Sequence, residues 1–239
     1  MAGVEFQPTR WSLVAAVREG NPATTEKAQA TLCEAYWYPL YAYVRSRGHD
    51  AEEARDLTQG FFARVMEKDL FSLADRERGR LRTFLLTALQ RFLRDEWRKG
   101  QQIKRGGGVP ALSIDTVAAE ERYAREPVDT MTPEVIFERR WALDLLERTL
   151  LGLRDEYAAA GKADLFDVLK HHLAPDGLEP SAEEAGTRLG MTAGAVRVAV
   201  SRLRTRYRER LLREVSTSLD ATTEAEVDGE IDALFRALA

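Results

Sequence analysis

The side chains best suited to chemistry lie in the segment 181–213, where arginines recur at positions that a helix would leave exposed. Guanidinium groups donate hydrogen bonds to phosphates and to guanine edges in the major groove, and short polar side chains permit close approach. The candidate contacts on this helix are Arg197, Ser201, Arg202, Arg204 and Arg206. The pattern predicts recognition of duplex DNA and implies no bond-breaking step.

The elements around these arginines have the layout of a helix-turn-helix. Ser181 and Glu184 form a capping box for a first helix, and Gly190 suits a tight turn. Thr192 caps a second helix. The apolar stripe of that second helix recurs at three- and four-residue steps and consists of Val196, Val200, Leu203 and Tyr207. The alternative is a solvated, arginine-rich surface helix with no partner.

A second basic segment covers residues 80–99, where apolar positions define one helix face and the opposite face is polar. The polar face and its border carry the candidate contacts Gln90, Arg91, Arg94, Trp97, Arg98 and Lys99. Arginines hold phosphates, and an aromatic surface stacks an unpaired base for about 1–3 kcal/mol. The segment therefore predicts contact with unpaired DNA. The alternative is that Trp97 completes a helical core beside solvated arginines.

Composition limits the classes of function. The chain has 239 residues and a net charge of −4, which argues against a free-standing nucleic-acid binder and favours one that a partner holds on DNA. Cys33 is the single cysteine, and the adjacent His171 and His172 would point about 100° apart on a helix, so we expect neither metal nor cofactor. No apolar run approaches the roughly 20 residues that span a bilayer, and we expect a cytoplasmic protein.

Helical periodicity is nearly continuous and strand alternation is absent, which predicts an all-α protein of two small helical domains. The expected helices cover residues 9–19, 23–37, 39–47, 51–68, 80–99, 133–160, 164–172, 182–189 and 193–215. Residues 106–132, which begin with three glycines, predict a flexible linker between the domains. A phosphate-binding loop is excluded there because no strand precedes the glycines and no Gly-Lys-Ser/Thr follows them.

The stretch HDAEEARDLTQGFFARVME, followed by GRLRTFLLTALQRFLRDEWRKGQQIKRGGG and then by the helix-turn-helix, resembles bacterial sigma factors of the extracytoplasmic-function (ECF) class. The resemblance covers residues 49–105 and 133–215 in the family's order and spacing. It implies a region-two domain at 1–105, a linker at 106–132, a region-four helix-turn-helix domain at 133–216 and an acidic tail at 217–239. It also implies core RNA polymerase and promoter DNA as partners, with the protein bound to polymerase at the nucleoid.

The resemblance implies a role for each surface. Glu52, Asp56 and Gln59, on the polar face of helix 51–68, would bind the clamp helices of core polymerase. The helix that carries Asp95 would read and melt the minus-ten promoter element, and the helix-turn-helix would read the minus-thirty-five element. The expected function is promoter-specific transcription initiation; the alternative is a stand-alone helix-turn-helix regulator. An enzyme is disfavoured because no set of nucleophile, base and orienting group is evident.

Departures from the family pattern bear on regulation. Arg55 precedes Asp56 where the family often has an acidic residue, so the expected polymerase-facing surface is less acidic than usual. Arg91 stands where Asn is common, which affects the minus-ten sequence preference. Thr58 replaces a frequent aliphatic residue and is a candidate phosphosite for a serine/threonine kinase; the alternative is a buried β-branched residue. An anti-sigma factor is the other regulator that the resemblance allows.

The acidic tail predicts one more helix. Thr223 and Glu226 form a capping-box pattern. The apolar residues that follow at helical spacing are Val227, Ile231, Leu234 and Leu238, with Phe235 beside them. One hypothesis places the carboxylates of this helix against the arginines of the helix-turn-helix, so that the tail shields the DNA-reading unit. The alternative is that the tail completes the core of the carboxy-terminal domain.

Overall fold

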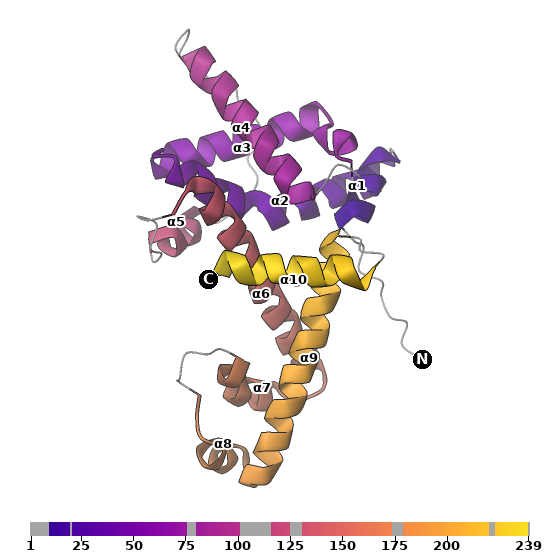
Figure 1. The fold of residues 1–239 in the computed structure, drawn as a ribbon, viewed down its shortest axis with the longest axis vertical. Coiled ribbons are helices and arrows are strands. Elements are labelled where there is room, and N and C mark those ends of the chain that lie inside the picture. The colour runs from indigo at the N-terminus through magenta and orange to yellow at the C-terminus, as the bar shows by residue number, and fades with distance from the viewer. Residues whose placement is uncertain are drawn as a thin grey trace. The chain divides into compact units, whose positions relative to one another are not determined.

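The computed structural model describes residues 10–19, 21–75, 80–100, 116–124, 131–173, 179–219 and 223–238 (Figure 1). The described residues form helices and short connections without a strand, which confirms the prediction of an all-α protein. The chain divides into two compact units, Met1–Leu143 with Ser216–Ala239, and Asp144–Val215. The division falls inside helices α6 (Pro133–Ala159) and α9 (Ala193–Leu219), whereas the expected domain boundary lay before residue 133.

The elements of the first unit are α1 (Arg10–Arg18), α2 (Pro22–Ser46), α3 (Ala51–Glu67), the 3-10 turn η1 (Leu70–Leu73), α4 (Leu81–Gly100), α5 (Thr116–Ala124), the first part of α6 and α10 (Glu224–Leu238). Those of the second unit are the rest of α6, α7 (Ala163–Leu169), the 3-10 turn η3 (Lys170–Leu173), α8 (Ala182–Leu189) and most of α9.

Helix α2 is the centre of the first unit. The sequence predicted two helices separated before Pro39, but the structure has one helix with Pro39 inside it. Proline removes a backbone donor and usually breaks a helix. Here the nine residues from Tyr36 to Val44 are all buried, with Trp37 stacked on Tyr41 at a centroid distance of 4.9 Å, and this packing holds the helix continuous.

The single cysteine lies on α2. Cys33 is fully buried, as expected of a small core residue, and burial raises the pKa of its thiol to about 12. A thiol in this state is a poor nucleophile at neutral pH.

Helix α5 is a correction to the expected linker, because residues 116–124 are helical and contact α2. Glu120 accepts a hydrogen bond from Arg45 Nε at 2.7 Å and another from the Tyr41 hydroxyl, and Arg122 lies over the Tyr38 ring at 4.2 Å. The weak periodicity of this segment concealed the helix, since its stability comes from these tertiary contacts. The three glycines of the expected linker lie outside the described residues.

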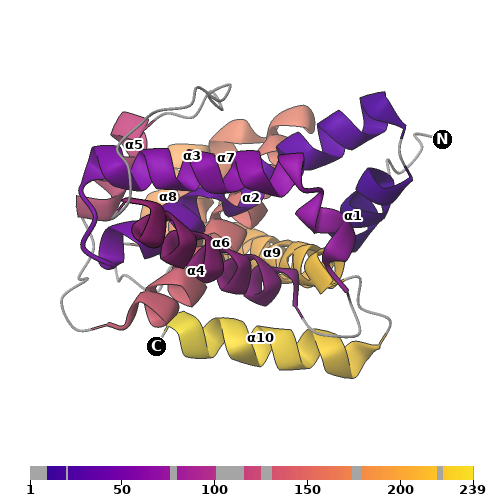
Figure 2. The ribbon, with the colours of Figure 1, turned by 90° about the horizontal axis from the view of Figure 1, so that it is seen from above.

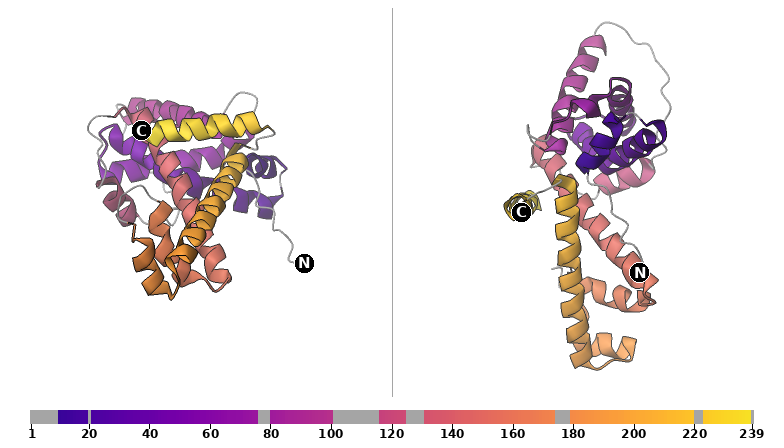
Figure 3. Two further views of the ribbon diagram at one scale, coloured as in Figure 1. Left: turned by 60° about the horizontal axis from the view of Figure 1, so that its bottom comes forward. Right: turned by 90° about the vertical axis from the view of Figure 1, so that its right-hand side faces the viewer.

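The second unit has its own core, in which α6 and α7 pack on the helix-turn-helix. Leu153, Leu169, Ala185, Val196 and Leu203 each have at most 1% of their surface exposed. Figures 1 and 3 show α8 beside the amino-terminal end of α9. The predicted bounds of α8, residues 182–189, are confirmed, and α9 extends four residues beyond its predicted end at residue 215.

Helix α10 begins where the capping box predicted. Thr223 N donates to Glu226 Oε2 at 3.1 Å, and Glu226 N donates to Thr223 Oγ1 at 3.3 Å. The helix belongs to the first unit, and Figure 2 shows it alongside α4. Glu230 of α10 pairs with Arg80 and Arg82 at the start of α4. The hypothesis that placed the tail against the helix-turn-helix is therefore wrong for Glu230. Leu234, on the apolar stripe, is fully buried and fixes which face of α10 packs inward.

Candidate nucleic-acid interface

The polar face of α3 is accessible. Asp50 caps this helix by accepting from Glu53 N at 2.8 Å, and Ala54, Phe61 and Val65 are fully buried on the opposite face. The side chains of Glu52 and Asp56 are 83% and 64% exposed, and Gln59 is partly exposed. The three residues expected to meet polymerase thus lie on one helix and remain reachable by a partner.

Arg55 reduces the negative charge of this face. Its Nε is 3.3 Å from Asp56 Oδ1, and its Nη2 is 4.0 Å from Glu52 Oε1. Such exposed pairs contribute about 0–1 kcal/mol each, because water screens them. The pairing therefore changes the surface potential of α3 more than the stability of the fold.

Thr58 is a correction to the expected phosphosite. Its side chain is fully buried, and its hydroxyl donates to the Ala54 carbonyl at 2.7 Å. A kinase needs an exposed hydroxyl, and a phosphate at this position would bury up to two negative charges among apolar side chains. The structure therefore selects the alternative, in which Thr58 is a β-branched core residue of α3.

Helix α4 presents its polar face as the sequence predicted. Arg91, Arg94 and Arg98 are exposed, while the side chain of Lys99 lies outside the described ones. Trp97 is 66% exposed, which excludes the interpretation that it completes a core. Asp95 is turned toward α3, where its Oδ2 is 3.1 Å from Arg64 Nη2. Asp95 thus links α4 to α3, while 42% of its side chain remains exposed.

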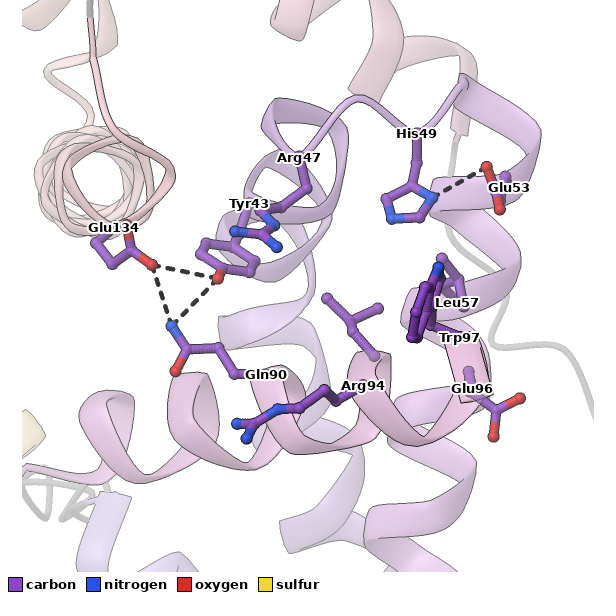
Figure 4. A pocket seen from close by; sticks show the side chains of 11 residues that line it. Tyr43, Arg47, His49, Glu53, Leu57, Gln90, Arg94, Glu96, Trp97 and Glu134 are labelled. Carbon is purple, nitrogen blue, oxygen red and sulfur yellow. Dashed lines mark hydrogen bonds and ion pairs between the residues drawn. The ribbon is translucent and has the colours of Figure 1, made fainter. Parts of the chain in front are cut away.

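A cavity of about 850 Å³ opens beside this face (Figure 4). Trp97, Leu57 and Leu93 supply apolar surface, and Arg94 and Arg47 supply cations. The remaining lining residues are Tyr43, His49, Glu53, Gln90, Glu96 and Glu134. Aromatic surface next to guanidinium groups is the combination that binds a base together with its phosphate.

Hydrogen bonds that no sequence pattern predicted join the side chains along one wall of the cavity. Gln90 Nε2 donates to Tyr43 Oη and to Glu134 Oε1, each at 3.1 Å, and the Tyr43 hydroxyl is 3.3 Å from the same carboxylate oxygen. His49 Nδ1 lies 3.0 Å from Glu53 Oε2 at the rim. Tyr43, Arg47, His49 and Glu134 were missed because the segments that carry them meet only in the folded unit.

The helix-turn-helix has the predicted caps. Ser181 N donates to Glu184 Oε2 at 2.8 Å, Glu184 N donates to Ser181 Oγ at 3.1 Å, and these hydrogen bonds lower the pKa of Glu184. Gly190 has a φ of 64°, the left-handed conformation that ends α8. Gly186 was missed: a Cβ there would lie 2.6 Å from the Met191 carbonyl oxygen, so only glycine permits this turn.

The five predicted duplex contacts are all exposed on α9, but they occupy two sides of it. Arg197 Nη1 is 3.8 Å from Glu183 Oε1, and Arg204 Nε donates to the His172 carbonyl at 3.1 Å, which places this pair on the side of α8 and η3. Arg202 and Arg206 line a separate cavity of about 510 Å³. At about 100° per residue, Arg197 and Arg202 point roughly 140° apart.

Between these two sides, α9 exposes a strip of short, uncharged side chains. Val198 is 52% exposed, and Ser201 and Thr205 are exposed with it. Arginines on either side of such a strip can reach two phosphate backbones while the strip approaches the bases. This arrangement suits insertion of α9 into a major groove.

The described part of the chain lacks both a cluster of potential metal ligands and a helix able to cross a membrane. Its His, Cys, Asp and Glu residues form no group of three or more that could hold a metal ion. None of its helices is both long and apolar enough to cross a bilayer.

Comparison with known proteins identifies a family. A family model described as "ECF sigma factor" matches residues 11–213, which include both candidate DNA-contacting helices and the polar face of α3. No curated protein and no solved structure matches the chain.

Proposed function

Because the chain belongs to the ECF sigma factor family, we propose that it is a promoter-specificity subunit that binds core RNA polymerase and the minus-ten and minus-thirty-five elements. The family places the protein in transcription initiation. In this proposal the protein catalyses no reaction itself and acts in the cytoplasm, bound to polymerase at the nucleoid. Three surfaces of the protein divide this role between them.

The α3 face is the proposed docking surface for polymerase. Glu52, Asp56 and Gln59 offer two carboxylates and an amide on consecutive turns, and the exposed side chains of Glu52 and Asp56 lose little packing when a partner covers them. The partner must be cationic opposite Asp56, since a buried carboxylate requires a paired charge. Arg55 weakens this attraction by lying between the two acids.

The cavity beside α4 is the proposed acceptor of an unpaired base of the minus-ten element. Trp97 offers a stacking surface, while Arg94 and Arg47 can hold the adjoining phosphates. Stacking contributes about 1–3 kcal/mol for each base, which is similar to the few kcal/mol that unstacking the base from the duplex costs. Binding energy of this size allows capture of a base to support promoter opening.

Helix α9 is the proposed reader of the minus-thirty-five element. The capping box and the glycine turn hold α8 against the start of α9, so the exposed strip and its flanking arginines are presented on a rigid element. Arg197, Ser201, Arg202, Arg204 and Arg206 are the proposed contacts. The proposed function is supported by the family match together with two candidate DNA surfaces on different units, the exposed arginine-bearing face of α9 and the cavity beside α4.

The deciding experiment is transcription in vitro with bacterial core polymerase and a promoter selected from the protein's own genome. Initiation should require this protein and should be lost in Asp56→Arg. Glu26→Arg is the matched control, because it reverses an exposed acid on another helix of the same unit. No initiation with the unaltered protein, or full initiation with Asp56→Arg, would reject the proposal.

The same preparation tests the stand-alone regulator. The capping box and the apolar core of the helix-turn-helix form within the second unit. They favour this second function, because they would present α9 to DNA without polymerase. Tight, sequence-specific duplex binding by the protein alone, combined with no effect of Asp56→Arg, would establish it.

A further inference from the structure

Two guanidinium groups converge on one carboxylate where α10 meets the start of α4. Arg80 Nη2 is 2.8 Å from Glu230 Oε2, and Arg82 Nη1 donates to Glu230 Oε1. Glu230 is fully buried and Arg82 is 3% exposed, whereas 41% of the Arg80 side chain remains exposed. Paired guanidinium groups around a single anion are also the arrangement that binds a phosphate.

Arg82 is held in place independently of α10. Its Nε is 2.8 Å from Glu138 Oε2, and its guanidinium carbon lies 3.9 Å above the Trp141 ring. Both partners come from α6. Departure of Glu230 would therefore leave a cation that is already oriented, with a second carboxylate to balance it.

Arg80 continues the basic face of α4 toward the amino terminus of that helix. The Arg80 carbonyl accepts from Phe84 N at 3.1 Å, so the helical hydrogen-bond pattern includes this residue. Thr83, Thr87, Arg91 and Arg94 follow Arg80 at three- and four-residue steps, which places them on the same side of α4. Helix α10 thus reaches the amino-terminal end of this side of α4 through the contact of Glu230 with Arg80.

We propose that Arg80 and Arg82 form a further phosphate-binding site for single-stranded DNA, and that Glu230 of α10 occupies this site until nucleic acid displaces it. The proposal rests on the proposed function, because it extends the minus-ten surface of α4. The proposal adds that the Glu230 carboxylate competes with DNA, because it occupies the position that a phosphate of the DNA backbone would take.

The anchoring of α10 suits displacement. Leu234 is fully buried, but Phe235 is 60% exposed, and Arg139 Nη1 donates to the Leu238 carbonyl at 2.9 Å. Gly229 precedes Glu230 and lowers the helix propensity of the segment. Helix α10 is therefore held by Leu234 and the partly buried Val227, Ile231 and Leu238, and by the ionic contacts of Glu230, which phosphate can replace.

The test measures binding of a fluorescein-labelled single strand to the full chain by anisotropy, without polymerase and over a range of salt. Glu230→Gln should bind about three- to tenfold more tightly at fixed salt. Its salt slope should steepen by about 0.7 for each additional phosphate contact. Asp228→Asn, an exposed change of the same charge on α10, should change affinity by less than about twofold.

Arg80→Gln in the Glu230→Gln background identifies the site. The double variant should lose the gain in affinity. Equal affinities for Glu230→Gln and Asp228→Asn would overturn the proposal, as would a gain that survives Arg80→Gln. Circular dichroism and thermal unfolding establish that each variant is folded.

A measurement on the unaltered protein covers the case in which Glu230→Gln does not fold. Hydrogen exchange of α10 amides should accelerate when the single strand is added, because displacement opens the helix contacts. Unchanged or slower exchange in α10, under conditions where the strand is bound, would overturn the proposal. Neither assay contains polymerase, so promoter-dependent transcription can fail or succeed independently of them.

Discussion

Gln90 and Glu134 lie 44 residues apart in the chain, yet Gln90 Nε2 donates to Glu134 Oε1 at 3.1 Å. This contact joins the polar face of α4 to the start of α6 and, through Tyr43, to α2. It closes one wall of the cavity next to which Trp97 is exposed. The candidate base-binding site is thus built by four helices, α2, α3, α4 and α6, although the sequence pattern that predicted it lies on α4 alone.

Trp97→Ala should weaken binding of unpaired minus-ten DNA while leaving the fold intact. The lost stacking is worth about 1–3 kcal/mol, or roughly 5- to 150-fold in affinity. The free energy of unfolding should change by less than about 0.5 kcal/mol, since Trp97 is 66% exposed. Anisotropy with a single-stranded promoter strand measures the first effect and urea unfolding the second. Leu73→Ala, at a side chain 65% exposed, is the control and should affect neither.

Arg55→Gln should strengthen association with core polymerase. The substitution releases Asp56 and Glu52 from a competing cation, and exposed pairs of this kind contribute about 0–1 kcal/mol. A fluorescence titration with core enzyme should show a dissociation constant lower by up to about fivefold, with the difference shrinking as salt rises. Arg154→Gln is the control, because it removes an arginine that pairs with the neighbouring Asp155 at 3.1 Å outside the α3 face. It should leave the affinity for core polymerase unchanged. Weaker binding by Arg55→Gln would show that Arg55 itself contacts polymerase.

Thr58→Val should retain transcription, and Thr58→Glu should unfold the first unit at lower urea. Valine keeps the β-branched shape and gives up one hydroxyl contact, for a cost of about 1 kcal/mol. Glutamate would bury a charge at a site with no exposed surface, for a cost of about 3 kcal/mol or more. Urea unfolding followed by circular dichroism distinguishes them. Stable, active Thr58→Glu would restore the phosphosite interpretation.

Gly186→Ala should destabilise the helix-turn-helix and weaken duplex binding. The added Cβ would lie 2.6 Å from the Met191 carbonyl oxygen, and relieving this clash requires the turn to shift, for about 1–3 kcal/mol. Gly194→Ala is the matched control on α9, since its Cβ has no atom nearer than 4.0 Å. That control should gain about 0.5–1 kcal/mol from helix propensity. Thermal unfolding should therefore move in opposite directions for the two variants.

Cys33 should make stability fall at high pH. Burial raises the pKa of its thiol in the folded chain to about 12, from 9.0. The folded state therefore keeps the thiol proton up to a higher pH than the unfolded state does. The contribution of Cys33 to the free energy of unfolding is present below about pH 9 and is lost as pH rises toward 12. The unfolding free energy should decline in this range more steeply than in Cys33→Ala, by up to about 1.4 kcal/mol per pH unit. Identical slopes in the two proteins would contradict the assignment of the loss to Cys33.

Local sequence patterns located the helices whose ends have capping groups. Ser181 with Glu184, Thr223 with Glu226, and Asp50 with Glu53 each start a helix where the spacing predicted, because these hydrogen bonds form within one turn of the chain. The exposed placement of Asp56, Arg94 and Arg197 followed from periodicity for the same reason: a helix fixes which of its residues share a face.

Contacts between helices were decided only by tertiary packing. Burial keeps α2 continuous through Pro39, Glu120 anchors α5 through Arg45, and Glu230 reaches Arg82 across 148 residues of sequence. None of these pairings has a period or spacing that a linear pattern could show. The amino-acid sequence by itself therefore determined the helices and their polar faces, because these depend on neighbours within a turn. The tertiary structure alone decided which carboxylate meets which arginine, because that free energy arises only when distant helices bury one another.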